Sequence, residues 1–316
     1  MKFLSLFSCS GISEYYLDRL NIEVVVANEL LEDRGKVYRF IYPNCNMIIG
    51  DIKDKYDEII KECKKKGVEG IIATPPCQSF SNAGKKLDND PRSPLFYYIL
   101  GAMKELDVKY VIIENVPTFL TSKIGSKKII DIINEEVGDN YEIREKVLNA
   151  EYFETPQTRK RSICLFSRKD CKVWKLPKKF ITNPITVLYT IGHLPSLESE
   201  ETSTINPFHY ASKHNNKHIL WMKHTPTGET AHSNKVYYPQ KDDGTKIKGY
   251  NTTYKWICWN KPCYTITMAN GSISSQNNVH PGRLLDDGTY SDARVLTIYE
   301  IILLTGLDDR WSHLIK

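Results

Sequence analysis

Two reactive side chains that follow apolar runs could act together on one substrate. Cys77 follows the apolar residues 71–73 and two prolines, and Glu114 directly follows the apolar residues 111–113. In an open α/β sheet, ligands bind in the crevice outside the carboxyl ends of the strands, so a thiol and a carboxyl at these positions would face one crevice. A thiol nucleophile beside a carboxyl that moves protons suits covalent attack on a flat ring.

The surroundings of both side chains favour this interpretation over a structural one. A free cysteine is most often a small buried apolar residue, and a single glutamate is most often exposed or caps a helix. The mostly polar residues 78–84 after Cys77 leave no apolar segment to which a core cysteine could belong. Glu114 stands between an apolar strand and a loop that contains Pro117. Both residues are therefore candidates for catalysis.

Apolar runs and helical patterns alternate along the first half of the chain. The patterns predict strands and helices in turn, which indicates a doubly wound, mostly parallel sheet covered on both faces, in the α/β class. The predicted strands are residues 3–7, 22–27, 71–73, 110–113 and 162–166, and the predicted helices are residues 13–20, 33–42, 55–66, 94–106 and 127–137.

The composition changes after about residue 180. From there to about residue 292 the chain is rich in Asn, Thr, Tyr, His, Pro and Gly, and it contains two Asp-Asp-Gly turns. Helical spacing returns at residues 293–306. We predict a larger domain of residues 1–183 and 292–316 and a smaller, loop-rich domain of residues 184–291.

Charge and cysteine content exclude several classes of protein. The chain has 316 residues and a formal net charge of +5, which does not by itself indicate nucleic acid. Its 8 cysteines form no C-x-x-C pair, so we expect neither a metal site nor a disulfide framework, but reduced thiols. No apolar run approaches the roughly 20 residues that span a bilayer. We expect a cytoplasmic protein without a membrane partner.

Three successive strand ends describe a groove for a nucleoside. The first is followed by the small-residue turn 7–14, the second by Asn28 and Glu29, and the third by Gly50 and Asp51. Glu29 could accept hydrogen bonds from both hydroxyls of a ribose, and Asp51 could accept one from an exocyclic amine. Each acid could equally be a helix N-cap or a first-turn acid, and the sequence leaves this open.

The motifs, taken in order, resemble those of the DNA (cytosine-5)-methyltransferases. The resemblance rests on residues 76–78, 114–116, 157–161 and 294–297 with Glu300. It implies a Rossmann-like fold that binds S-adenosyl-L-methionine as cofactor. The residues implied to bind the cofactor are Phe7, Ser8, Cys9, Ser10, Gly11, Ile12, Glu29, Leu30, Asp51, Ile52, Pro76 and Leu95.

The resemblance also implies a reaction for the candidate residues. The Cys77 thiolate would add to carbon 6 of cytosine, because carbon 5 alone is too poor a nucleophile to take a methyl group. Glu114, kept partly protonated in a dry pocket, would contact ring nitrogen 3 and the exocyclic amine. Arg161 would contact the ring carbonyl oxygen, and Arg159 would brace the site. A solvated charge run is the alternative for residues 157–161.

The implied substrate is double-stranded DNA with the cytosine flipped out of the helix. Residues 184–291 would then be a target-recognition domain, and a cognate restriction endonuclease would be a partner. The residues expected to contact DNA are Gln78, Ser81, Lys85, Arg92 and Thr265. Two other functions stay open, namely a tRNA cytosine-5 methyltransferase and an inactive DNA-binding subunit of a split enzyme.

The chain departs from the family pattern in two places. Cys9 and Ile12 occupy positions where glycine is common in the first turn. The last cofactor-binding motif of the family, Gly-Asn-Ser/Ala-Val, does not occur in the sequence. We expect either that a second polypeptide supplies this motif or that the chain is a truncated form.

Overall fold

The computed structural model describes residues 1–76, 95–267 and 270–307. The chain forms two compact units. The first unit consists of Met1–Leu148 and Lys160–Lys178, and the second consists of Asn149–Arg159 and the chain from Lys179 onward. Within the described residues, no helix is both long and apolar enough to cross a membrane.

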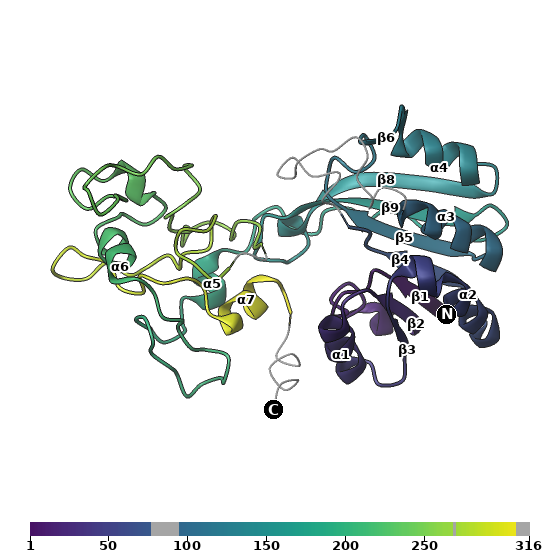
Figure 1. The fold of residues 1–316 in the computed structure, drawn as a ribbon, viewed down its shortest axis with the longest axis horizontal. Helices are drawn as coiled ribbons and strands as arrows, with labels where there is room; N and C mark the ends of the chain where they lie inside the picture. The colour runs from purple at the N-terminus through teal and green to yellow at the C-terminus, as the bar shows by residue number, and fades with distance from the viewer. Residues whose placement is uncertain (77–94, 268–269, 308–316) are drawn as a thin grey trace. The chain divides into compact units, whose positions relative to one another are not determined.

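The first unit is built on a 7-stranded sheet with the strand order β3-β2-β1-β4-β5-β9-β8 (Figure 1). The pairs from β3 to β5 are parallel, and β9 runs antiparallel to β5. This arrangement confirms the predicted fold class. The strands are β1 (Lys2–Leu6), β2 (Glu23–Glu29), β3 (Asn46–Ile49), β4 (Gly70–Ala73), β5 (Tyr110–Asn115), β8 (Tyr141–Asn149) and β9 (Lys160–Arg168); β6 (Lys123–Ile124) and β7 (Lys127–Lys128) form a separate pair.

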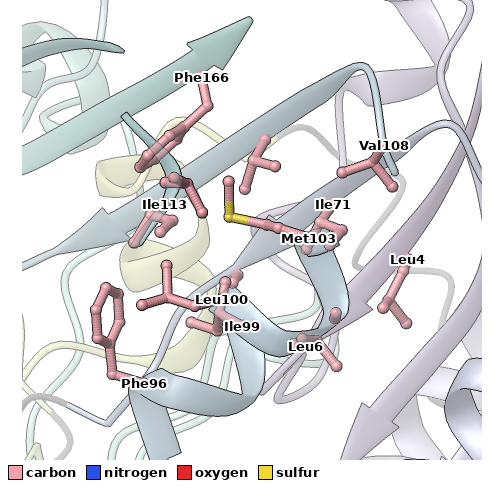
Figure 2. Packing of buried hydrophobic residues seen from close by; sticks show 14 of the residues in the cluster. Leu4, Leu6, Ile71, Phe96, Ile99, Leu100, Met103, Val108, Ile113 and Phe166 are labelled. Carbon is pink, nitrogen blue, oxygen red and sulfur yellow. The ribbon is translucent and has the colours of Figure 1, made fainter. Parts of the chain in front are cut away.

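Helices cover both faces of the sheet because successive strand residues point to opposite faces. Leu4 and Leu6 of β1 join the large apolar cluster beneath α2, α3 and α4, which Figure 2 shows around Met103. Phe3, the residue before Leu4, joins a different cluster together with Tyr110. The helices of this unit are η1 (Leu17–Leu20), α1 (Glu32–Ile41), α2 (Ile52–Lys66), α3 (Leu95–Leu106) and α4 (Ile129–Val137).

Two parts of the first unit differ from the prediction. The predicted helix of residues 13–20 is reduced to turns and the short η1, because the Glu14 side chain is buried among hydroxyl groups instead of facing solvent on a helix. Strand β8 was not predicted. Its exposed Glu, Arg and Lys side chains hide the apolar alternation, as is common in strands at a sheet edge.

The second unit is rich in loops, as predicted. Its described helices are η2 (Ala150–Tyr152), α5 (Val187–Ile191), α6 (Asn216–Lys223), η3 (Ala231–Ser233) and α7 (Ile298–Leu304). Two apolar clusters stabilise it, one around Trp256 and one around Ile257.

The end of the chain packs differently from the predicted domain division. Ala293 and Val295 belong to the cluster around Trp256, and Leu304 belongs to the cluster around Ile257. Residues 293–307 therefore pack with the second unit, whereas the prediction grouped them with the larger domain. Helix α7 begins at Ile298, directly after its N-cap Thr297, and the capping box between Thr297 and Glu300 of its first turn stabilises this end.

Candidate active site

A cavity of about 530 Å³ lies in the first unit at the carboxyl ends of β1, β2, β3 and β4. It brings together eight of the twelve predicted cofactor residues, and it omits Ser8, Ser10, Gly11 and Ile12. Its lining residues are Phe7, Cys9, Asn28, Glu29, Leu30, Leu31, Arg34, Gly50, Asp51, Ile52, Lys53, Thr74, Pro76 and Leu95. Arg34 and Lys53 were not predicted; each lies in the first turn of a helix that follows a predicted strand end.

Glu29 is held rigidly at the end of β2. Its side chain is buried, and its two carboxylate oxygens accept hydrogen bonds from the backbone N–H groups of Cys9 (2.9 Å) and Leu31 (3.0 Å). A carboxylate has about four acceptor positions, so further donors can still bind. Glu29 is not a helix N-cap, because the N-cap of α1 is Leu31.

Asp51 is a helix N-cap, one of the two roles that the sequence left open, and it also lines the cavity. Its side chain caps α2 by accepting a hydrogen bond from the Lys53 N–H at 3.0 Å, and the same residue lines the cavity. A carboxylate at a helix N-terminus is stabilised by the N–H groups there.

The first turn after β1 is fixed by contacts on several sides. Phe7, Cys9 and Gly11 all have positive φ angles. A Cβ atom on Gly11 would collide with the ring of Tyr42, whose hydroxyl donates a hydrogen bond to the Gly11 carbonyl at 2.7 Å. Ser8 is buried and donates to the Asn28 carbonyl at 3.0 Å. Ser8 and Gly11 therefore shape the turn without lining the cavity.

Glu114 and Arg161 form an ion pair on neighbouring strands. Arg161 Nε lies 2.9 Å from Glu114 Oε1, and the two side chains are 21% and 32% exposed. The sequence predicted a dry pocket for Glu114. In the described structure the carboxyl is instead about a third exposed, because it stands near the end of β5.

Asn115 connects Glu114 to the loop that leads to Cys77. Its buried amide donates a hydrogen bond to the Pro75 carbonyl at 2.9 Å, and its carbonyl oxygen accepts one from the Val116 N–H at 2.8 Å. Cys77 itself lies outside the described residues. The described chain ends there at Pro76, which lines the cavity.

The remaining predicted residues are distributed as follows. Arg159 belongs to the second unit, where its backbone N–H donates to Asn149 Oδ1 at 3.0 Å. Thr265 donates from its hydroxyl to the Thr158 carbonyl at 2.8 Å in the same unit. The predicted DNA contacts Gln78, Ser81, Lys85 and Arg92 lie outside the described residues. Among the described residues, no cluster of side chains suits a metal ion.

Comparisons with known proteins show the family of the chain. A sequence profile of the C-5 cytosine-specific DNA methylase family matches residues 1–316. Type II methyltransferase M1.HgaI of Avibacterium volantium is 46% identical over 320 residues, which cover 98% of this chain and 88% of that protein. The tRNA (cytosine(38)-C(5))-methyltransferase of Spodoptera frugiperda is 33% identical over 172 residues, which cover 51% of this chain and 50% of that protein.

A solved structure shares the fold. It is that of a protein described as a DNA modification methyltransferase encoded within a prophage of E. coli, and it superposes with a TM-score of 0.71 at 19% identity, covering 99% of this chain and 92% of that one. The likeness at this level of identity concerns the fold alone. The family profile and the relative M1.HgaI go further, since each matches almost the whole chain. The chain therefore belongs to the C-5 cytosine-specific DNA methylase family.

Proposed function

We propose that this protein transfers a methyl group from S-adenosyl-L-methionine to carbon 5 of a flipped-out cytosine in double-stranded DNA. The observation that carries the proposal is the link between the cavity and Glu114. Pro76 lines the cavity, and the carbonyl of the preceding Pro75 is bound by Asn115, the neighbour of Glu114. A cofactor in the cavity and a cytosine bound at Glu114 would then lie at the same edge of the sheet.

The described residues fit the proposed cofactor. A cavity of about 530 Å³ is in the size range of small-molecule sites. Glu29 has acceptor capacity left for ribose hydroxyls, and Asp51 is placed to accept from an amine. Apolar side chains for the faces of an adenine ring come from Leu30, Ile52 and Leu95. When bound, S-adenosyl-L-methionine supplies a methyl group on a positively charged sulfur.

The proposed chemistry begins at Cys77. Its thiolate forms a bond to carbon 6 while the Glu114 carboxyl, which first takes up a proton from solvent, delivers that proton to nitrogen 3, so that the ring becomes an enamine with a nucleophilic carbon 5. After carbon 5 has taken the methyl group, it loses its proton to solvent water, and the electron pair of that bond forms the double bond to carbon 6 and expels the Cys77 thiolate. Nitrogen 3 then returns its proton to Glu114. Arg161 orients the Glu114 carboxyl through the ion pair.

The described thiols offer few competitors for the role of nucleophile. Burial raises the pKa of Cys45, Cys63, Cys164 and Cys263 to about 12, so these thiols stay protonated and unreactive near neutral pH. The described thiols that are not buried are Cys9, Cys171 and Cys258, and we propose Cys77 as the residue that attacks the ring.

Transfer of labelled methyl groups from S-adenosyl-L-methionine to genomic DNA tests the proposal. We expect label on carbon 5 of cytosine with the wild-type protein and none with Cys77→Ser. Cys45→Ser is a control, because this thiol lies outside the cavity lining and should not alter the products. Label on another base or atom would contradict the proposal.

A tRNA substrate is a second candidate, favoured by the similarity to the Spodoptera enzyme. That similarity covers only 51% of this chain, whereas the similarity to M1.HgaI covers 98%. Parallel assays with tRNA and with DNA separate the two. An inactive DNA-binding subunit would give label on neither.

We also propose that the protein is the modification enzyme of a type II restriction-modification system, as the name of the relative M1.HgaI suggests. A cognate restriction endonuclease and a second polypeptide that supplies the last motif stay predictions.

A further inference from the structure

One segment of the second unit exposes aromatic and cationic side chains together. Residues 234–250, which we call the lysine–tyrosine hairpin, lie beside α6 and are drawn in green in Figure 1. Val236 is 72% exposed and Tyr250 is 76% exposed, and Tyr237 is also exposed. Single exposed apolar side chains are ordinary, but a group of them on one short hairpin is typical of a binding surface.

The hairpin carries an excess of available positive charge. Its four lysines are all exposed, and none of them forms an ion pair within the described part of the chain. The two acids of the hairpin have other partners: Asp242 pairs with Lys217 of α6, and Asp243 accepts a hydrogen bond from the Thr245 N–H at 2.8 Å. The lysines are Lys235, Lys241, Lys246 and Lys248.

The hairpin is held in a defined shape. Its arms are joined by the bridge between Gln240 and Lys246 and by a hydrogen bond from the Ile247 N–H to the Pro239 carbonyl at 2.8 Å. At its base, the Asn234 amide lies 2.9 Å from Thr225 Oγ1 and 2.7 Å from the Tyr237 carbonyl. A surface presented in one shape binds with a smaller loss of conformational entropy than a free tail does.

Contacts at both ends of the hairpin orient its tyrosines. Tyr237 stacks on His224 with ring centroids 4.0 Å apart. Gly249 packs so closely on His232 that a Cβ atom would collide with the imidazole. The next residue, Tyr250, is fixed through its carbonyl, which accepts hydrogen bonds from the N–H (3.0 Å) and the hydroxyl (2.9 Å) of Thr253, and its ring projects into solvent.

We infer that the lysine–tyrosine hairpin is a DNA-contacting element of the second unit; the inference rests on the proposed function. Lys246 lies over the ring of Tyr238, 4.8 Å from its centroid, but this contact leaves the positive charge without an acidic partner. Lysines without an acidic partner attract a phosphate backbone and release its counterions, which makes binding depend on salt. An exposed aromatic ring stacks on a base or wedges between base pairs. Lys246 and Lys248 bind phosphates, and Tyr250 contacts a base or sugar.

The test compares hairpin variants with matched exposed residues elsewhere in the unit. The hairpin variants are Tyr250→Ala and the double variant Lys246→Ala with Lys248→Ala. The controls are Tyr189→Ala, on α5 and 80% exposed, and Lys213→Ala, whose ammonium already pairs with Glu200. The full chain is titrated onto a random-sequence DNA duplex at several salt concentrations, and methyl transfer to genomic DNA is measured separately.

We expect Tyr250→Ala to weaken DNA binding about 10-fold, in the range of one lost stacking contact. The double lysine variant should reduce the slope of log affinity against log salt by about 0.9 for each lysine. Both controls should bind as the wild-type protein does. Hairpin variants that match the controls in affinity and salt slope would overturn the inference. Failure of the wild-type protein to methylate DNA would instead overturn the proposed function, because the binding titration does not depend on transfer.

Discussion

The guanidinium of Arg161 lies against the carboxylate of Glu114, with Nε 2.9 Å from Oε1. The pairing follows from the strand register. Glu114 on β5 stands opposite Ile163 on the antiparallel β9, and Arg161 is two residues along β9 on the same face of the sheet. Diagonal neighbours of this kind are within reach of long side chains. The register thus fixes the position of the carboxyl that we propose as proton donor.

Replacement of Glu114 should reduce catalysis much more than stability. We expect Glu114→Gln to lower the rate of methyl transfer about 100- to 10,000-fold, because the variant loses a positioned acid. The unfolding free energy should change by less than about 1 kcal/mol, since a partly exposed ion pair contributes little. Single-turnover kinetics and urea unfolding measure the two effects.

Arg161→Ala should lower the rate in the same assay without weakening cofactor binding, because the residue does not line the cavity. Arg144→Ala is a matched control, since Arg144 pairs with Glu142 at 3.5 Å on β8 of the same unit. A wild-type rate for Arg161→Ala would show that the ion pair has no part in positioning Glu114.

Asn115 should act as a positioning residue through the loop that precedes Cys77. Asn115→Asp keeps the acceptor for the Val116 N–H but turns a carboxylate oxygen toward the Pro75 carbonyl. We expect a loss of about 1–3 kcal/mol of stability from the broken buried hydrogen bond. The rate of adduct formation with DNA should fall with it, while Asn46→Asp, a half-buried amide on β3, should leave that rate unchanged. An unchanged rate in Asn115→Asp would exclude the positioning role.

Glu29 should control cofactor affinity. Glu29→Gln replaces a carboxylate oxygen that accepts a backbone N–H by an amide that cannot accept, so one of the N–H groups of Cys9 and Leu31 loses its partner. We expect binding of S-adenosyl-L-methionine to weaken about 10- to 100-fold, as for a lost hydrogen bond to a charged group. Calorimetric titration measures this. Glu32→Gln, at an exposed acid three residues along the chain, is the control and should bind normally.

Sequence reasoning reached the strand ends but not the contacts that connect them. Apolar runs in the sequence predicted the strands β1, β2, β4, β5 and β9. Residues that follow β1, β2 and β4 line one cavity. The bond from Asn115 to the Pro75 carbonyl joins residues 40 positions apart, and no local pattern encodes it. The burial of Glu14 and Arg294 was equally inaccessible, because a charged residue is expected at the surface until its partners are known.

Buried charged groups of the second unit predict a loss of stability in acid. His280 is fully buried, with Nδ1 3.8 Å from Asp292 Oδ1 and Nε2 3.7 Å from Glu300 Oε1. Arg294 bonds both acids, at 3.1 Å and 2.8 Å. Burial lowers the pKa of His280 to about 4. Burial by itself would raise the pKa of Asp292. The charges of His280 and Arg294 and the hydrogen bonds from Ser196 and Ser291 outweigh burial and hold this pKa below its usual range.

These shifts act in the same direction. The pKa of His280 is about 6.5 in the unfolded chain and about 4 in the folded protein. Between these two pH values the unfolded chain binds more protons than the folded protein, so the free energy of unfolding falls as the pH falls. Protonation of His280 can lower the free energy of unfolding by about 3 kcal/mol at most. Below about pH 4, protonation of Asp292 and Glu300 adds to the loss, because their pKa values are lowered in the folded state.

Urea unfolding of the wild-type protein and of His280→Asn between pH 7 and pH 4.5 tests this prediction. Tryptophan fluorescence reports the second unit through the buried Trp221 and Trp256. We expect the wild-type midpoint to fall with pH and the variant to lose less over the same range, because it lacks one group that takes up a proton on unfolding. Burial also lowers the pKa of His209 and His214, so the variant should keep part of the slope. Parallel profiles would show that His280 titrates alike in the folded and unfolded chain.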